Sequence, residues 1–208
     1  YQQETESIAV FGHVEYGLTD ALSLVLGARY TNETRDWTGC TYVADDGSLA
    51  LFLNNVFGLA GSPFELGVGD CGTINDIGGF DPAFNPYDDS IDTSRMTGKV
   101  GLDWRPSDDL LVYGSISSGF KSGGFNGANS NTTTQLIPYE EEVLTAYEIG
   151  TKATLMGGAM QLNGAVFFYD YEDKQEQDRA VTLVGNISGL TNVDESEIYG
   201  AELELTWQ

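Results

Sequence analysis

The sequence has few bases, few cysteines and no long apolar run. Of its 208 residues, 9 are Lys or Arg and 32 are Asp or Glu, which gives a formal net charge of -23. Such a charge repels phosphates and excludes nucleic acid as a partner. No run of about 18 apolar residues is present to cross a bilayer as a helix. A helical membrane protein is therefore excluded, whereas a membrane β-barrel is not, because its alternating strands average out in hydropathy.

Residues that commonly carry catalysis or bind metals are also scarce. The chain has one histidine, His13, and two cysteines. It contains no nucleophile motif, phosphate-binding loop or dinucleotide fingerprint. We therefore predict no enzyme, no metal site and no cofactor. Cys40 and Cys71 lie in one stretch rich in Gly, Asp and Asn, which favours a disulfide closing a long loop in an oxidising compartment, with two free thiols as the alternative.

Alternation of apolar and polar residues recurs along the chain and predicts β-strands. In the stretch RMTGKVGLDWR, for example, Val100 and Leu102 fall on one face with Trp104, and Lys99 falls on the other. Seven strands are predicted, over residues 7–16, 21–31, 95–105, 110–121, 143–155, 159–173 and 198–207. The sixth is ambiguous because its aromatic residues occupy both faces, namely Phe167, Phe168, Tyr169 and Tyr171.

The connections between these strands alternate strictly between short and long. The short ones, near Asp20, Ser107 and Gly157, are built from Gly, Asp, Pro and Ser. The long ones are polar and glycine-rich and cover residues 36–92, 123–142 and 175–193. This alternation is typical of an outer-membrane barrel, with short periplasmic turns and long extracellular loops. The sequence therefore predicts an all-β fold, an antiparallel transmembrane β-barrel segment of about seven strands from a larger barrel.

The distribution of charge tests the membrane interpretation, since an Arg or Lys facing lipid at the bilayer midplane costs about 2–4 kcal/mol. Five of the seven predicted outward faces contain no charged residue. The residues predicted to face lipid are Leu24, Leu26, Val100, Leu102, Leu203 and Leu205. A soluble two-sheet sandwich has the same alternation, so a second signal is needed.

Aromatic residues at the strand ends supply that second signal. They are predicted to form two girdles, with Tyr16, Trp104 and Trp207 at the lower rim and Tyr30, Phe120, Tyr147 and Tyr199 at the upper rim. From Tyr199 to Trp207 the strand rises about 26 Å, or roughly 20 Å along the normal at a tilt near 40°. This is close to the apolar band of about 25 Å in such barrels.

The stretches VYGSISSGFKSGGFNG, PYEEEVLTAYEIGTKATL and LNGAVFFYDYEDKQEQ resemble the barrel portion of TonB-dependent receptors. The opening ETESIAVFGHVEYGLTDALSLVLGARYTNETRDW and the closing NVDESEIYGAELELTW are similar to that family as well. The resemblance implies a 22-stranded barrel, of which residues 1–208 are a partial barrel domain without the plug domain and the remaining strands. It also implies an integral protein of the outer membrane of a Gram-negative bacterium.

The same resemblance implies energised import of a scarce ligand, most often a ferric siderophore and in other members haem, cobalamin or an oligosaccharide. The implied partners are outer-membrane lipid and lipopolysaccharide, the iron-siderophore ligand, and the TonB complex acting through the missing N-terminal part of the parent. Two other functions remain open. The first is another outer-membrane barrel, such as a passive channel or an adhesin, and the second is a soluble secreted carbohydrate-binding β-domain.

Five of the nine basic residues are predicted to face the lumen, where they would contact an anionic ligand or the plug. These candidate ligand-binding residues are Arg29, Arg95, Lys99, Lys121 and Lys152. In the alternative, they form cross-strand pairs that stabilise the inner wall. The carboxylates available for such pairs are Glu15, Asp103, Glu148, Glu202 and Glu204.

Two further features of the long loops have alternative interpretations. The apolar stretch from Leu49 to Ala60 is predicted to fold over itself beneath the disulfide, or to cover the barrel mouth and touch ligand. The acidic loop residues form a solvated surface, or bridge divalent cations to lipopolysaccharide. The glycine run after Phe120 is predicted to mark the exit from the membrane, because the alternating pattern of the strand ends there. A phosphate-binding loop is rejected, because no strand-to-helix context follows the run.

Overall fold

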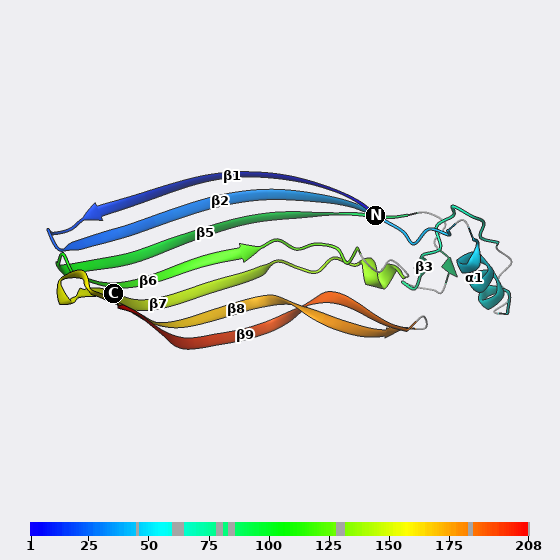
Figure 1. Ribbon diagram of the computed structural model, residues 1–208. Coiled ribbons are helices and arrows are strands. Elements are labelled where there is room, and N and C mark those ends of the chain that lie inside the picture. Colours follow the sequence, from blue (N-terminus) through cyan, green and yellow to red (C-terminus); the bar gives the residue numbers. More distant parts are fainter. Residues whose placement is uncertain are drawn as a thin grey trace.

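The computed structural model describes residues 1–44, 46–59, 65–77, 81–82, 86–127, 132–182 and 185–207. Seven long strands form one antiparallel sheet in which neighbours in sequence are neighbours in space. They are β1 (Gln2–Gly17), β2 (Leu22–Gly39), β5 (Tyr87–Ser107), β6 (Leu110–Lys121), β7 (Glu142–Leu155), β8 (Met160–Thr182) and β9 (Gly185–Trp207). The sheet is curved and open, with β1 and β9 at its edges (Figure 1). The all-β prediction is therefore confirmed.

Short turns join β1 to β2, β5 to β6 and β7 to β8 at one end of the sheet, as the sequence predicts (Figure 1). In the first turn, the Thr19 hydroxyl accepts hydrogen bonds from the backbone N–H groups of Ala21 and Leu22, at 3.2 and 3.0 Å. The third turn contains the short helix η2 (Met156–Gly158), where Gly157 and Gly158 have φ of 66° and 98°. Glycine adopts this left-handed backbone at little cost.

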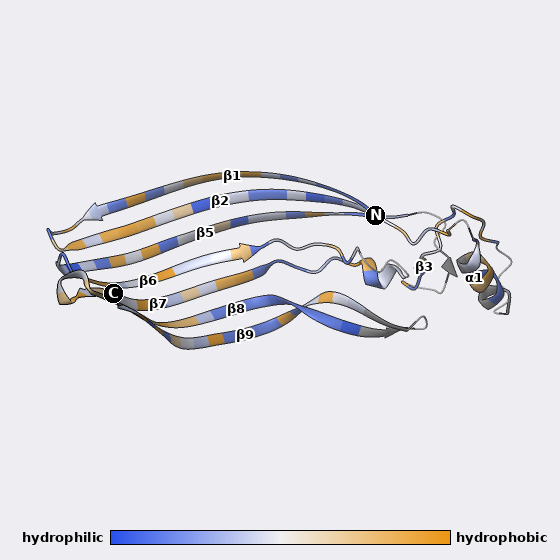
Figure 2. Ribbon diagram, viewed as in Figure 1, coloured by the Kyte–Doolittle hydropathy of each residue, from blue (hydrophilic) through white to orange (hydrophobic). Residues whose placement is uncertain are grey.

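The register sorts the strand residues onto two faces. Leu26 lies opposite Val100, and Leu24 lies opposite Leu102. Residues directly opposite each other in a sheet share a face. The registers of β6, β7, β8 and β9 keep the apolar residues of these strands on that same face. One continuous face thus carries the apolar residues that are predicted to face lipid. Figure 2 shows apolar and polar residues alternating along the strands toward the short turns.

The ambiguous aromatic residues of β8 are also sorted by the register. Phe168 lies opposite both Tyr147 and Tyr199, so it belongs to the apolar face. The rings of Phe168 and Tyr147 are in contact, with centroids 6.2 Å apart. Phe167 and Tyr169 point to the other face, and their rings lie 4.7 Å apart.

Two of the three predicted long loops are shorter than expected, because the strands continue beyond the apolar band. β2 and β5 remain paired as far as Gly39 and Tyr87, and β8 and β9 as far as Thr182 and Gly185. The prediction of a loop over residues 175–193 is therefore wrong. Along β2 and β5, the face that continues the apolar face becomes polar in these extensions, and side-chain hydrogen bonds link the strands there, as between Thr34 and Asp92 at 2.7 Å.

The hairpin of β8 and β9 twists sharply where it leaves the apolar band. Asp173 has φ of 51°, and the register passes from Glu172 opposite Glu195 to Lys174 opposite Val193. Aspartate is one of the residues that tolerates this backbone conformation. Beyond this point the two strands cross, so that β9 lies on the side of β7 and of the connection between β6 and β7 (Figure 1).

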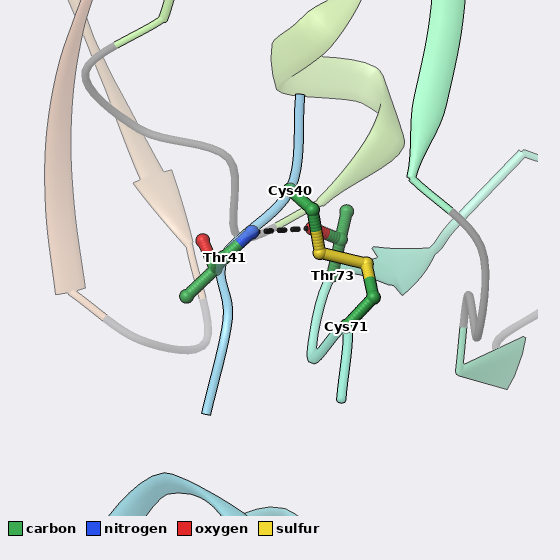
Figure 3. The surroundings of a disulfide bond; sticks show 4 residues. All are labelled: Cys40, Thr41, Cys71 and Thr73. Atoms are coloured by element: carbon green, nitrogen blue, oxygen red, sulfur yellow. Dashed lines mark hydrogen bonds between the residues drawn. A yellow bond between two sulfur atoms is a disulfide. The ribbon is translucent and has the colours of Figure 1, made fainter. Parts of the chain in front are cut away.

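The first long connection folds into a small lobe, which we call the disulfide lobe and define as the described residues from Cys40 to Ile77. Its disulfide joins Cys40, directly after β2, to Cys71, with Cα atoms 5.8 Å apart (Figure 3). Beside the disulfide, the N–H of Thr41 donates to the Thr73 hydroxyl at 3.0 Å. The lobe's own apolar core consists of Val43, Ala50, Leu53, Leu66 and Ile74.

The apolar stretch of this lobe is helical rather than an irregular loop. It forms α1 (Ser48–Leu59), and the short strands β3 (Ile74–Asn75) and β4 (Asp81–Pro82) pair nearby. The Asn54 side chain fixes the helix by pairing with both backbone groups of Leu66, at 2.8 and 3.0 Å. In the described part of the chain, no helix has the length and apolarity needed to cross a membrane.

Candidate functional site

The connection between β6 and β7 packs against the inner face of the strand extensions; we call its described residues, 122–127 and 132–141, the central loop. Trp37 lies eight residues along β2 from Arg29 and therefore on the same face. Trp37 forms a buried cluster with Phe125 and Leu136, the latter in the short helix η1 (Thr133–Leu136). Tyr87 packs against this cluster, and its burial together with its hydrogen bond to Asp89 raises the pKa of Tyr87 to about 12.

Three aromatic rings stack at this point. The Trp37 ring lies between Tyr1, at a centroid distance of 4.5 Å, and Phe125, at 5.4 Å. A Cβ atom added to Gly127 would clash with the buried Trp37 ring and come within 3.1 Å of the Tyr1 ring, so a glycine is needed where the central loop crosses the stack. The outer ring, Tyr1, is largely exposed.

Arginines of β2 and β5 fix the two ends of the central loop. Arg35 donates from Nη1 to the carbonyl of Gly123 at 2.8 Å and forms an ion pair with Glu33 at 2.7 Å. Arg95 forms an ion pair with Glu141 at the other end of the loop. Both guanidinium groups are thus engaged with carboxylates or carbonyls of the protein.

The glycine run after Phe120 has a structural reason in this arrangement. Gly124 and Tyr139 form a backbone pair with N–H to carbonyl distances of 3.0 and 2.9 Å. A Cβ atom on Gly123 would lie 2.5 Å from the Tyr139 carbonyl oxygen. Only glycine allows the two ends of the loop to approach this closely.

Side-chain amides join the central loop to the twisted hairpin. Asn126 pairs with both backbone groups of Leu190, at 2.7 and 3.0 Å, and Asn192 pairs in the same way with Glu140, at 2.8 and 3.1 Å. Each amide replaces one residue of a neighbouring strand, because its donor and acceptor match a peptide group. The loop therefore satisfies the strand edge of β9 at Leu190 without a further strand.

Gln175 on β8 holds the start and the end of the central loop together. Its side chain is buried, and Nε2 donates to the carbonyls of Ser122 at 3.0 Å and Glu140 at 2.9 Å. Its backbone N–H donates to the Glu142 carboxylate at 2.7 Å. A buried amide with several partners is a strong local constraint, since its loss removes hydrogen bonds to both ends of the loop at once.

The disulfide lobe is joined to the central loop through Asp76. The Asp76 carboxylate accepts hydrogen bonds from the Thr133 hydroxyl and the Thr134 N–H, each at 2.9 Å. Burial alone would raise the pKa of Asp76, but these hydrogen bonds outweigh it and the pKa is lowered. The ionised carboxylate is thus the form that links the two loops.

A cavity of about 330 Å³ lies between the central loop and the upper part of the hairpin. The loop contributes Asn126, Thr134, Gln135, Ile137, Pro138 and Tyr139, and the hairpin contributes Asp178 and residues 188–192. Its volume is at the lower end of the range typical of small-molecule sites.

The five candidate basic residues do not form one site. Arg29, Arg95 and Lys99 lie close together on β2 and β5, where Lys99 faces Gly27 and Arg95 faces Thr31. The other two are remote from this group, since Lys121 is at the upper end of β6 and Lys152 lies near the short turns. Their contact with a ligand stays a prediction.

The alternative prediction pairs these bases with five named carboxylates. Arg95 does not follow it, because its partner is Glu141, which is not one of the five. Asp103 instead pairs with Arg105 on its own strand, at 3.3 Å. Glu148 accepts a hydrogen bond from the Tyr113 hydroxyl at 2.6 Å, and Glu204 accepts one from the Asn163 amide at 3.2 Å. Neutral donors on the neighbouring strand thus take the place of some of the expected cations, from the directly opposite position for Asn163 and Glu204 and from a diagonal position for Tyr113 and Glu148.

The residues predicted to face lipid and to form the girdles share the apolar face. Leu203 is 78% exposed and Val100 is 55% exposed in this open sheet. The girdle residues Trp104 and Trp207 lie near the short turns, and Tyr30 and Tyr199 lie toward the strand extensions. Contact of this face with lipid stays a prediction for each individual residue.

An open, curved antiparallel sheet with one apolar face, short turns at one end and folded loops at the other defines a segment of an outer-membrane β-barrel. The family model described as TonB dependent receptor-like, beta-barrel matches residues 1–208. The chain therefore belongs to the TonB-dependent receptors, which are integral outer-membrane proteins and transport receptors rather than enzymes.

Solved structures of low sequence identity have the same fold. The ferric yersiniabactin uptake receptor FyuA from Yersinia pestis is 18% identical with a TM-score of 0.62, and the match covers 99% of this chain and 24% of that one. The copper transporter OprC is 14% identical with a TM-score of 0.68, covering 99% and 27%. The siderophore receptor PiuA from Acinetobacter baumannii is 18% identical with a TM-score of 0.59, covering 99% and 23%. The chain spans about a quarter of the length of these proteins.

Sequence reasoning missed the residues that organise the central loop. Asn126, Gln175 and Asn192 are polar residues in glycine-rich or acidic surroundings, and no periodicity distinguishes them. The partners of Asn126 are 64 residues away, so only the folded hairpin reveals the contact. Arg35 and Trp37 lie two residues apart and therefore share one face of β2. This spacing would have indicated both residues if the predicted strand had been extended beyond residue 31.

Proposed function

We propose that the receptor containing this chain imports a ferric siderophore or another iron complex by TonB-driven transport. Several proteins of the same fold support iron as the cargo. Besides FyuA and PiuA, they include the ferric-catecholate import receptor Fiu from E. coli and the hemophore receptor HasR of Serratia marcescens in complex with its hemophore HasA and heme. OprC is a copper transporter, so copper is the competing cargo that the experiment must test.

The observation that favours a ligand-gated receptor over a passive channel is the packing of the central loop. The loop lies against the inner face of β2 and β5 through Trp37 and Arg35, and is joined to the hairpin through Gln175. A passive channel needs an open path along its inner wall. A loop folded over that wall instead provides a surface for capture of ligand at the outer end of the barrel.

The remaining partners follow from the proposed membrane position. The apolar face contacts outer-membrane lipid, and the polar extensions above it lie at the level of lipopolysaccharide. The TonB complex acts through the N-terminal part of the parent receptor. The lumen-facing Arg29 and Lys99 are exposed and are available to the plug or to a ligand that has passed the loops.

Uptake of radioactive iron tests this proposal. Cells that lack the receptor gene, and the same cells complemented with the full-length receptor, are given ferric chelates one at a time, with and without a functional TonB complex. We expect iron uptake that requires both the receptor and TonB. Receptor-dependent uptake of copper but not of iron, or uptake that persists without TonB, would contradict the proposal.

A further inference from the structure

The sequence contains two Asn–Gly pairs, and the structure places them in different surroundings. One is Asn126–Gly127 in the central loop, and the other is Asn163–Gly164 in β8. In such a pair the backbone nitrogen of the glycine can attack the side-chain carbonyl carbon of the asparagine, because glycine has no side chain to shield that nitrogen. The attack releases ammonia and closes a cyclic succinimide, which water then opens to aspartate or isoaspartate.

Both residues of the loop pair are required by their contacts. Asn126 is half-buried, and its amide pairs with the N–H and the carbonyl of Leu190, at 2.7 and 3.0 Å. Gly127 lies against the Trp37 ring, where a Cβ atom would clash. The contact with Leu190 thus needs an amide, and the crossing of the aromatic stack needs a glycine. The reactive pair follows from two separate demands of the fold.

In the closed loop, hydrogen bonds occupy both reacting groups. The N–H of Gly127 donates to the Phe125 carbonyl at 3.1 Å, and the Asn126 carboxamide is fixed by Leu190. The glycine nitrogen has to lose its proton before it attacks, and the carboxamide has to turn toward it. Both steps break these hydrogen bonds, so the reaction requires the loop to leave the hairpin. Each bond is weak, and a segment held by such contacts opens locally far more often than the whole protein unfolds.

The pair in β8 lacks such a route. Gly164 lies within the sheet, opposite Thr151 of β7 and Leu203 of β9. A strand that is paired on both sides cannot turn its glycine nitrogen toward the preceding asparagine side chain unless the neighbouring strands separate. That opening approaches unfolding of the barrel wall and is correspondingly rare. Asn163 is therefore an internal control for Asn126.

From these observations we propose that Asn126 is a site of spontaneous deamidation that reacts only while the central loop is detached from the hairpin. In each event the bond between Cγ and Nδ2 of Asn126 breaks, ammonia leaves, and a water molecule supplies the new oxygen. An aspartate at this position has no N–H for the Leu190 carbonyl and brings a negative charge next to it. An isoaspartate also adds a methylene group to the backbone beside Trp37. The modified loop cannot restore both hydrogen bonds, so the reaction records irreversibly that the loop has opened.

Peptide mapping of the full-length receptor by mass spectrometry tests the proposal. The receptor is incubated in detergent in a mildly alkaline buffer, with and without concentrated urea, and is then digested at acid pH, where the succinimide forms slowly. The variant Gln175→Ala removes the donor that joins the two ends of the loop, and Asn192→Ala removes the amide that pairs with Glu140. The control Gln161→Ala shortens a glutamine of the same strand near the short turns, opposite Thr154.

In the folded receptor we expect Asn126 to deamidate about tenfold more slowly than in urea, or slower still, and Asn163 to stay unmodified. Gln175→Ala and Asn192→Ala should each raise the rate at Asn126 about tenfold, and Gln161→Ala should leave it within about twofold. Heat-modifiability shows that each variant is folded.

Three results would overturn the proposal. The first is an equal rate at Asn126 in the folded and the urea-unfolded receptor, because the contacts of the closed loop would then give no protection. The second is an equal rate at Asn126 and Asn163 in the folded receptor. The third is a rate at Asn126 that neither Gln175→Ala nor Asn192→Ala raises, because opening of the loop would then not limit the reaction.

Discussion

Replacing Val100 by Arg tests the orientation of the whole sheet. Val100 lies on the apolar face between Leu26 and Ile116. It is four residues from Trp104 at one rim and four from Met96 at the other, or about 13 Å along the strand in each direction. At a tilt near 40° this is roughly 10 Å along the membrane normal, so Val100 lies near the centre of an apolar band of about 25 Å.

An Arg at this depth costs about 2–4 kcal/mol, which is about 30- to 900-fold in the equilibrium between inserted and non-inserted receptor. Leu102 lies only about 5 Å above the level of Trp104 along the normal. We therefore expect Leu102→Arg to cost roughly 1–2 kcal/mol, because the penalty falls toward the interface. The two variants should form a graded series.

The assay is the amount of heat-modifiable full-length receptor in the outer membrane. Ser115→Arg is the matched control, because Ser115 lies on the other face, opposite Gly101 and beside Glu148. Lys99→Gln, also on that face, should be tolerated as well. Equal loss of receptor in Val100→Arg and Ser115→Arg, or a larger loss in Leu102→Arg than in Val100→Arg, would show that the orientation is wrong.

Two further predictions concern the loops. Cys71→Ser removes a crosslink between residues 31 apart in sequence, which corresponds to about 3–4 kcal/mol of loop-closure entropy. We therefore expect limited proteolysis to cut the disulfide lobe of this variant while the barrel stays heat-modifiable. An uncut lobe would contradict this prediction. Because the pKa of Asp76 is lowered in the folded state, the ionised Asp76 carboxylate stabilises the folded lobe above pH 4, and this contribution is lost as the pH falls through the folded pKa. We therefore expect pepsin to cleave the lobe faster below pH 4. The variant Asp76→Ala should remove most of this pH dependence.

The part of the fold inside the membrane was predictable, because lipid on one face enforces a period of two. Val100, Leu102 and Trp104 fall on one face of β5 for that reason, and the register confirms that they share it. The extensions were not predictable in the same way. Thr34 and Asp92 form a cross-strand hydrogen bond in a region where the face that continues the apolar face is polar, so the sequence there has the composition of a loop.

The candidate site was less predictable than the fold, because it depends on contacts between distant segments. The turn of the hairpin at Asp173 brings Leu190 to the central loop, and a single left-handed residue is not visible in a hydropathy pattern. The candidate basic residues follow only from the alternation of side chains between the two faces of each predicted strand. The alternation places Arg95 on the face opposite the apolar residues, where the register also has it, but it does not show that Glu141 of the central loop is its partner.

The amide pairs also explain how polar strands can extend beyond the membrane without exposing a reactive edge. The edge of an extended strand presents unpaired N–H and carbonyl groups that other chains can pair with. At Leu190 both groups are satisfied by Asn126, and on the loop side both groups of Glu140 are satisfied by Asn192. These contacts are hydrogen bonds near the surface, each of which contributes only about 0.5–1.5 kcal/mol. The central loop is thus held in one position by many weak polar contacts.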